Sequence, residues 1–267
     1  MKFKIFFLLL AVCSLALPAR STEETQAKED ALKNIFETAK ANDKITEIYG
    51  LYQQNTVRKI SEEGRVKKQK TSVYRTIWLN DVPYAELITI DGRPLSKKEK
   101  DEETDRRKKF LKRLKDKKED KTDDEDFDLT WQDLYQKYEF HKLPAEGQAA
   151  YVFSFRSKGG KQKERNRMEK VFNHLSGKFW ADKDFNLLRV EARLQDDVKF
   201  GLGLLAKVEQ LQLQYTQQPY QKVWLPATLH VAFQARIALL KTERQEIETR
   251  FYAPFPRPVN PAPASAP

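Results

Sequence analysis

The chain has 267 residues, a formal net charge of +10 and one cysteine. With a single cysteine, an internal disulfide and a thiolate metal cluster are both excluded. The length suits one large domain or two small ones, and it is sufficient to bury a substantial core.

The N-terminal segment has the form of a secretory signal peptide. Lys2 and Lys4 precede an apolar run over 5–17, which is too short for a stable membrane span of roughly 20 apolar residues. We therefore expect 1–21 to be removed on export and the mature chain to reside in the periplasm. An alternative is a lipid anchor on Cys13. Because export separates the chain from nucleic acid, we expect no nucleic-acid partner, and the basic charge favours peripheral contact with an anionic membrane surface.

The next part of the sequence predicts a helix followed by strands. Over 23–44, apolar residues recur at four-residue spacing and charged residues occupy the other face, which predicts an amphipathic helix. The stretches 45–59, 66–79 and 82–90 are rich in β-branched and aromatic residues, which is typical of strands. Asn80-Asp81 predicts a tight turn between the last two.

Residues 93–126 form a charged helical insertion. Ser96 and Glu99 have the spacing of a capping box, and basic and acidic residues follow in nearly equal numbers. Such a balance indicates an exposed helix with many ion pairs. A docking helix for a partner is the alternative. The Asp-rich stretch 123–128 lacks the glycine and the terminal glutamate of a calcium loop, so we read it as a linker.

The remainder predicts a short helix over 129–138 and then strands. The expected strands cover 138–143, 149–156, 175–181, 187–194, 204–215, 224–236 and 238–252. The clearest alternates Leu229, Val231 and Phe233 against polar neighbours such as His230.

About ten strands with short connections indicate antiparallel pairing, and so many twisted strands curl rather than stay flat. We therefore predict a mainly β (α+β) fold. A curved antiparallel sheet forms an open half-barrel in a single domain over 22–252, with an N-terminal helix and the charged insertion. The proline-rich tail 253–267 is expected to be disordered.

The sequence shows no arrangement typical of catalysis. His141, His174 and His230 lie far apart and lack metal-ligand spacing, and a strand turn explains the pair Asp182 and Asp184. We expect no enzymatic activity, no metal and no cofactor.

Three segments of the second half carry a family resemblance. The strand Gly177–Asp182 is followed by a turn, the alternating strand Leu187–Glu191 and, later, a strand opened by Val223-Trp224-Leu225-Pro226. This order resembles the periplasmic lipoprotein-carrier superfamily, which includes LolA/LolB-like and outer-membrane lipoprotein-sorting proteins. The resemblance implies an open half-barrel with helices on one face and a cavity for acyl chains. It further implies non-enzymatic binding or carrying of lipid or lipoprotein acyl chains in the bacterial envelope, with lipid or an acylated protein as partner.

The predicted strands supply an apolar trough for such chains. Its candidate ligand-binding residues are Ile77, Leu87, Phe153, Phe179, Val190, Leu211, Leu213, Leu229, Val231 and Phe233. Each methylene transferred from water to this surface gains about 0.8 kcal/mol. The same residue types also form ordinary cores, so a filled core is the alternative. A sensor or protein-interaction module that uses the same half-barrel is the alternative function. The sequence carries no signal for an oligomeric state.

Overall fold

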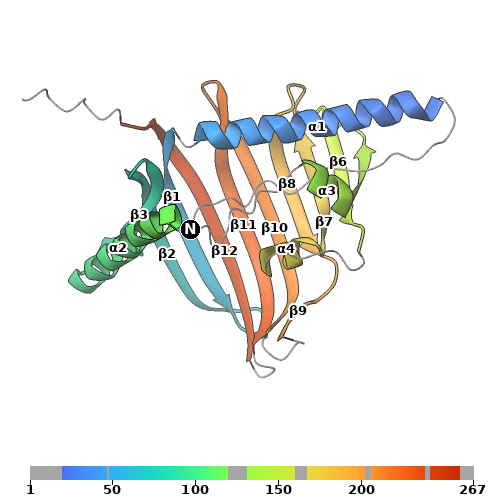
Figure 1. Cartoon of the computed structure of the whole chain (residues 1–267). Coiled ribbons are helices and arrows are strands. Elements are labelled where there is room, and N and C mark those ends of the chain that lie inside the picture. Colours follow the sequence, from blue (N-terminus) through green and yellow to red (C-terminus); the bar gives the residue numbers. More distant parts are fainter. Residues whose placement is uncertain are drawn as a thin grey trace, which may run out of the picture.

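A single antiparallel sheet of twelve strands carries most of the chain (Figure 1). The computed structural model describes residues 20–46, 48–119, 131–159, 167–201, 206–237 and 241–258. The strands are β1 (Tyr49–Ile60), β2 (Val66–Leu79), β3 (Val82–Ile90), β4 (Arg93–Pro94), β5 (Tyr138–Leu143), β6 (Tyr151–Ser157), β7 (Leu175–Ala181), β8 (Leu187–Leu194), β9 (Val198–Phe200), β10 (Ala206–Tyr220), β11 (Val223–Ile237) and β12 (Lys241–Pro256). The helices are α1 (Arg20–Thr46), α2 (Lys97–Glu119), α3 (Trp131–Lys137) and α4 (Arg167–Phe172).

The strand order is β4-β3-β2-β1-β12-β11-β10-β8-β7-β6-β5, and β9 pairs with β10 off this path. The predicted fold class is confirmed: the protein is mainly β, with an open antiparallel sheet, an N-terminal helix and a mid-chain helix. Residues 1–19, with Cys13, and the predicted linker 123–128 lie outside the described residues, so the expectations about them stay predictions.

The first and last strands along the chain, β1 and β12, are neighbours in the middle of the sheet. β12 pairs with β1 along its length, from Tyr49 opposite Pro256 to Ile60 opposite Arg244, and with β11 on its other side. Residues 253–256, which we expected to be disordered, therefore belong to β12. Backbone pairing with β1 overrides the disorder that the local proline content predicts, because proline is tolerated in a strand where its nitrogen has no ladder bond to donate.

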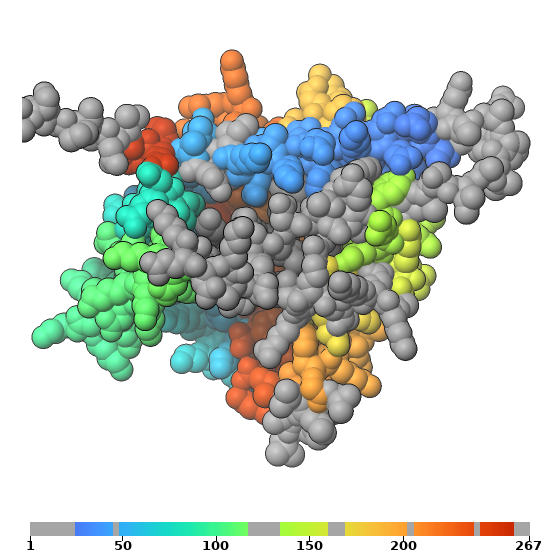
Figure 2. All heavy atoms as spheres, in the orientation of Figure 1, coloured from blue at the N-terminus to red at the C-terminus, as the bar shows by residue number. Residues whose placement is uncertain are grey.

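Side chains alternate between the two faces of the sheet. One face carries the apolar residues against which α1 packs, and we call it the helix face; the other is the open face. Figure 1 shows α1, α3 and α4 in front of the same side of the sheet. In the space-filling view, α1 forms a ridge along one border of that side, whereas α2 projects at the flank (Figure 2).

The main core lies between these helices and one end of the sheet. Leu32, Ile35 and Phe36 of α1 are buried against strands β5 to β8, where Phe153 and Phe179 stack with ring centroids 5.3 Å apart. A second buried cluster on the helix face joins β1, β10, β11 and β12; it consists of Leu51, Tyr215, Val223, Leu225, Leu229 and Phe251.

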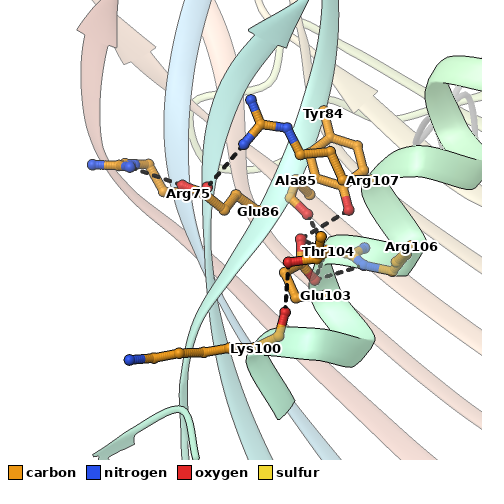
Figure 3. Close-up of polar contacts among 9 residues, drawn as sticks. All are labelled: Arg75, Tyr84, Ala85, Glu86, Lys100, Glu103, Thr104, Arg106 and Arg107. Atoms are coloured by element: carbon orange, nitrogen blue, oxygen red, sulfur yellow. Dashed lines mark hydrogen bonds and ion pairs between the residues drawn. The ribbon is translucent and has the colours of Figure 1, made fainter. Parts of the chain in front are cut away.

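Helix α2 covers part of the outer edge of β3 (Figure 3). Arg106 lies 4.8 Å from the Tyr84 ring centroid and donates to the Ala85 carbonyl oxygen at 2.5 Å. Glu103 accepts from Arg106 and from the Tyr84 hydroxyl, each at 2.8 Å. Because an uncovered edge strand can pair with another chain, this contact protects the sheet edge.

The predicted capping box at the start of α2 is confirmed. The Ser96 amide donates to the Glu99 carboxylate at 2.8 Å, and the Glu99 amide donates back to the Ser96 hydroxyl at 3.4 Å. Arg93 also donates to this carboxylate, and together these bonds hold the pKa of Glu99 well below its usual range. The Asn80-Asp81 turn is confirmed too, with positive φ at both residues as a tight hairpin requires.

Candidate binding face

The helix face places nine of the ten predicted trough residues together. Cross-strand partners point to the same side, so the register defines rows across the sheet. One row joins Leu229, Tyr215, Val190, Phe179 and Phe153 from β11 to β6. A second joins Val57, Ile247, Val231, Leu213 and Ala192 from β1 to β8.

Two predicted residues lie near the far end of the sheet. Leu87 of β3 is opposite Tyr74, Tyr74 is opposite Gln53, and Gln53 is opposite the core residue Phe251. Leu87 therefore shares the helix face. Ile77 is three residues from Tyr74 along β2 and lies on the other face, so it does not belong with the predicted trough. Polar and apolar residues do not alternate cleanly in β2, so no sequence pattern separates Ile77 from the other predicted trough residues.

The remaining predicted residues divide into a filled part and a partly exposed part. Phe153, Phe179, Val190 and Leu229 are buried in the two core clusters. These four residues therefore belong to a filled core, which was the alternative to a ligand-binding trough. By contrast, the residues over the middle strands are only half-buried. We call these half-buried residues the apolar band; they are Val57, Leu211, Leu213, Val231, Phe233 and Ile247.

A lysine cluster lies at the β1–β2 end of the same rows. Lys70 is opposite Val57, and in the next row Lys68 is opposite Lys59, which in turn is opposite Gln245. The three lysines are exposed. Sequence reasoning missed this cluster, although the alternation of Lys68 and Lys70 with Gln69 in a predicted strand was a usable signal.

Buried polar atoms without a partner lie beside the apolar band. Asn55 of β1 is opposite Thr249 of β12, and Thr249 is opposite the core residue Leu229. Thr249 is 1% exposed, yet its hydroxyl has no hydrogen-bond partner, and neither has the Asn55 carbonyl oxygen Oδ1. On α1, the amide nitrogen Nδ2 of buried Asn42 also lacks a partner. Leaving such an atom without a partner costs about 1–3 kcal/mol, so a ligand that forms a hydrogen bond with it removes part of that cost.

The open face carries a polar hollow of about 1030 Å³ over strands β5 to β10. Ser154, Ser176, Arg156, Lys178 and Arg193 line it. Glu139, Glu191 and Asp196 balance these three cations. With no net charge among its lining side chains, the hollow has the properties of a solvated sheet surface.

A smaller hollow of about 470 Å³ lies where β2 and β12 end. Ile77 lines it together with Trp78, Phe255 and Arg257. Arg257 pairs with Asp81 and lies 5.8 Å from the Trp78 ring centroid, so the contacts here join the β2–β3 turn to the end of β12.

A buried ion pair stabilises the small helices. Lys137 at the end of α3 pairs with Glu169 of α4, which is 1% exposed, and the Tyr138 hydroxyl donates to the Phe172 carbonyl oxygen. Burial raises the pKa of Tyr138. Removal of one member of such a pair leaves an unpaired buried charge, so its evident role is to hold α4 against α3 and β5.

The three histidines are not brought together. His141 and His230 are on the open face of β5 and β11, five strand steps apart along one row, and His174 lies in the turn before β7. Asp182 accepts from the amides of Asp184 and Asn186, which confirms that the Asp pair forms a turn. Among the described residues, no group of histidine and acidic side chains has the arrangement of a metal site.

Comparisons with known proteins give little. No protein-family model matches the chain, and neither does any curated protein. A solved structure, a conserved protein of unknown function with a hot dog fold from Alicyclobacillus acidocaldarius, is 9% identical, covers 84% of this chain and 87% of its own, and has a TM-score of 0.15. A TM-score this low carries no argument about fold or function. Within the described part of the chain, no helix has the length and apolar character needed to cross a bilayer.

Proposed function

We propose that the protein binds the acyl chains of lipids or acylated proteins on the helix face, as a non-enzymatic binding or carrier protein of the cell envelope. The supporting observation is the apolar band. Phe153 and Phe179 are buried in the main core together with residues of α1, whereas the band residues of β1 and β10 to β12 are only half-buried. Apolar surface that the protein's own side chains do not fully cover is available to an apolar ligand.

The free energy of burying an acyl chain is large enough for this binding. An acyl chain gains about 0.8 kcal/mol for each methylene moved from water, so a few buried methylenes offset much of the cost of association. Binding of this kind needs no nucleophile, base or metal. The predicted export signal would direct the chain to the envelope, where lipids and acylated proteins are plentiful.

The first test is to purify the full chain from a membrane-bearing host and to extract it with organic solvent. Mass spectrometry of the extract is expected to show phospholipid or acylated peptide at a defined ratio to protein. In parallel, the fluorescence of cis-parinaric acid, which rises in apolar surroundings, is expected to increase on titration with the delipidated protein.

A pair of neighbouring substitutions provides a matched control. Val231 lies in the apolar band, and the next residue, Ala232, is on the open face of the same strand. Val231→Asn is expected to weaken binding of the probe, whereas Ala232→Asn leaves it unchanged. Equal binding by both variants, or a protein partner captured by this face with no lipid bound, contradicts the proposal.

A further inference from the structure

We propose that the ligand of the apolar band is an amphiphile with an anionic head group, and that this head group lies at the lysine cluster of Lys59, Lys68 and Lys70. This inference rests on the proposed function and names the class of ligand.

The lysine cluster has an unfavourable arrangement in the free protein. Lys59 and Lys68 are directly opposite each other on antiparallel strands, and Lys70 lies on the same face two residues further along β2. Like charges in directly opposed positions destabilise a sheet. An anion between them converts this repulsion into attraction.

The nearby acidic side chains neutralise the cluster only in part. Among the described residues, none of the three lysines forms an ion pair. The Glu243 carboxylate attracts Lys59 through space, but it is paired with Lys241 at 2.6 Å. The neighbouring acids Glu246 and Glu248 are on the open face of β12 and are separated from the cluster by the sheet.

The cluster continues directly into the apolar band. Lys70, Val57, Ile247 and Val231 are successive members of one cross-strand row. Strands are about 4.8 Å apart, so the four steps from β2 to β10 span roughly 19 Å. That span accommodates a long acyl chain lying across the strands, with its charged end at the lysines.

The unpartnered polar atoms lie one row away from the Lys70–Val231 row, on the side opposite to Lys59 and Lys68. Asn55 is two residues from Val57 on β1, and Thr249 is two residues from Ile247 on β12, so both flank the row that links lysines to band. A chain with polar atoms near its head group, such as a carboxyl or an ester, would give these buried atoms the hydrogen bonds they lack. The apolar row, the exposed lysines and the unpartnered polar atoms therefore describe one amphiphilic ligand.

The experiment compares cis-parinaric acid with its methyl ester, which has the same chain and no charge. Wild-type full-length protein is expected to bind the acid about five- to tenfold more tightly than the ester at low salt. This ratio corresponds to the free energy that a few exposed charge contacts contribute. The difference is expected to shrink at high salt because the contacts are solvent-exposed.

The variant Lys59→Gln/Lys68→Gln/Lys70→Gln is expected to bind both probes with the affinity that wild type shows for the ester. Its control is Lys98→Gln/Lys109→Gln/Lys112→Gln, which removes equal charge from exposed positions of α2 and keeps the preference for the acid.

The outcomes separate the two proposals. Equal binding of acid and ester by wild type, or a preference that survives in the cluster variant, overturns the head-group inference and leaves acyl-chain binding standing. Loss of the preference in the α2 control shows a general charge effect and also overturns the inference. Binding of neither probe by wild type contradicts the proposed function itself. The thermal midpoint of the cluster variant, expected to equal or exceed that of wild type, excludes misfolding as the cause.

Discussion

The backbone carbonyl oxygen of Glu191 lies well inside van der Waals contact of the point where a Cβ atom on Gly177 would stand. The Phe155 ring also crowds this point. Gly177 is opposite Ala192, which follows Glu191 on β8, so any side chain here would push β7 from β8.

Gly177→Ala is therefore expected to lower the free energy of unfolding by about 1–3 kcal/mol, the range of overpacked cores. Gly50→Ala is the comparison, because its nearest neighbours are the far atoms of the Phe255 ring, which can turn away. Urea unfolding should show the larger loss for Gly177→Ala. The reverse order would show that β7 and β8 can separate more easily than this geometry allows.

Substitutions on the helix face should affect stability and ligand binding differently in the filled core and in the apolar band. Phe179 is 1% exposed, so Phe179→Ala is expected to cost about 3–5 kcal/mol of stability. Phe233 is half-buried, so Phe233→Ala should cost clearly less but weaken binding of cis-parinaric acid. Denaturant unfolding and probe titration on both variants check this. A Phe233→Ala variant that is as unstable as Phe179→Ala would place Phe233 in the core instead.

The opposed lysines predict a gain in stability. Lys68→Glu replaces repulsion with Lys59 by attraction, and it is expected to raise the free energy of unfolding by about 0.2–1 kcal/mol at low salt. Lys222→Glu, in the exposed turn between β10 and β11, is the control and is expected to have little effect. Unfolding at two salt concentrations tests the expectation, since screening should reduce the gain. A loss of stability on Lys68→Glu would contradict the pairing of Lys59 with Lys68.

Glu248 predicts a dependence of stability on pH. Hydrogen bonds from Arg250 and Arg58 lower the pKa of this carboxyl below its usual range. A carboxylate with a lowered folded-state pKa contributes stability above its unfolded pKa of about 4.3, and the contribution is lost as the pH falls through the folded pKa. Glu248→Gln should therefore be less stable than wild type at pH 7, by up to about 1 kcal/mol because the pair is partly exposed.

The difference between Glu248→Gln and wild type should vanish in acid, below the folded-state pKa. Urea midpoints from neutral to acid pH measure it. A constant difference across that range would show that the carboxylate charge does not contribute.

The contact of α2 with the sheet depends on Arg106. Arg106→Ala removes the bond to the Ala85 carbonyl and the contacts with the Tyr84 ring and Glu103. We expect a loss of about 1–2 kcal/mol and more self-association, because the β3 edge becomes less protected. Arg113→Ala, at an exposed position of the same helix, should behave like wild type in thermal unfolding and analytical ultracentrifugation. Equal self-association of both variants would show that the surface of α2, and not the edge of β3, causes the association.

Much of the fold was predictable because the pattern is local. Five strands have the predicted bounds. In these strands, β-branched and aromatic residues continue as far as recognisable turn residues, as in the turn between Leu79 and Val82. Three elements were missed: β4 and β9, which have only 2 and 3 residues, and α4, which has 6. Elements this short have no periodicity and exist because neighbours pair with or cover them.

The candidate site was less predictable because it depends on register. Alternation within β11 identifies Val231 and Phe233 as one face, but only the pairing of β1 with β12 brings Val57 and Ile247 beside them. The pairing of β1 with β2 then extends the row to Lys70. No local signal shows which strand will become the neighbour of the first. The alternating lysines of β2 were therefore visible in the sequence, but their place beside the apolar band was not.

The insertion of the last strand between β1 and β11 has a consequence for how the protein is made. A chain emerging N-terminus first can form the β1–β3 meander and the β5–β11 region early, but the two remain unjoined until residues 241–256 appear. Contacts of such large sequence separation form slowly. Until then, two long unpaired strands are exposed, so premature release or truncation near the C-terminus would leave halves prone to aggregate, and a helper that keeps the nascent chain extended would be of most use at this stage.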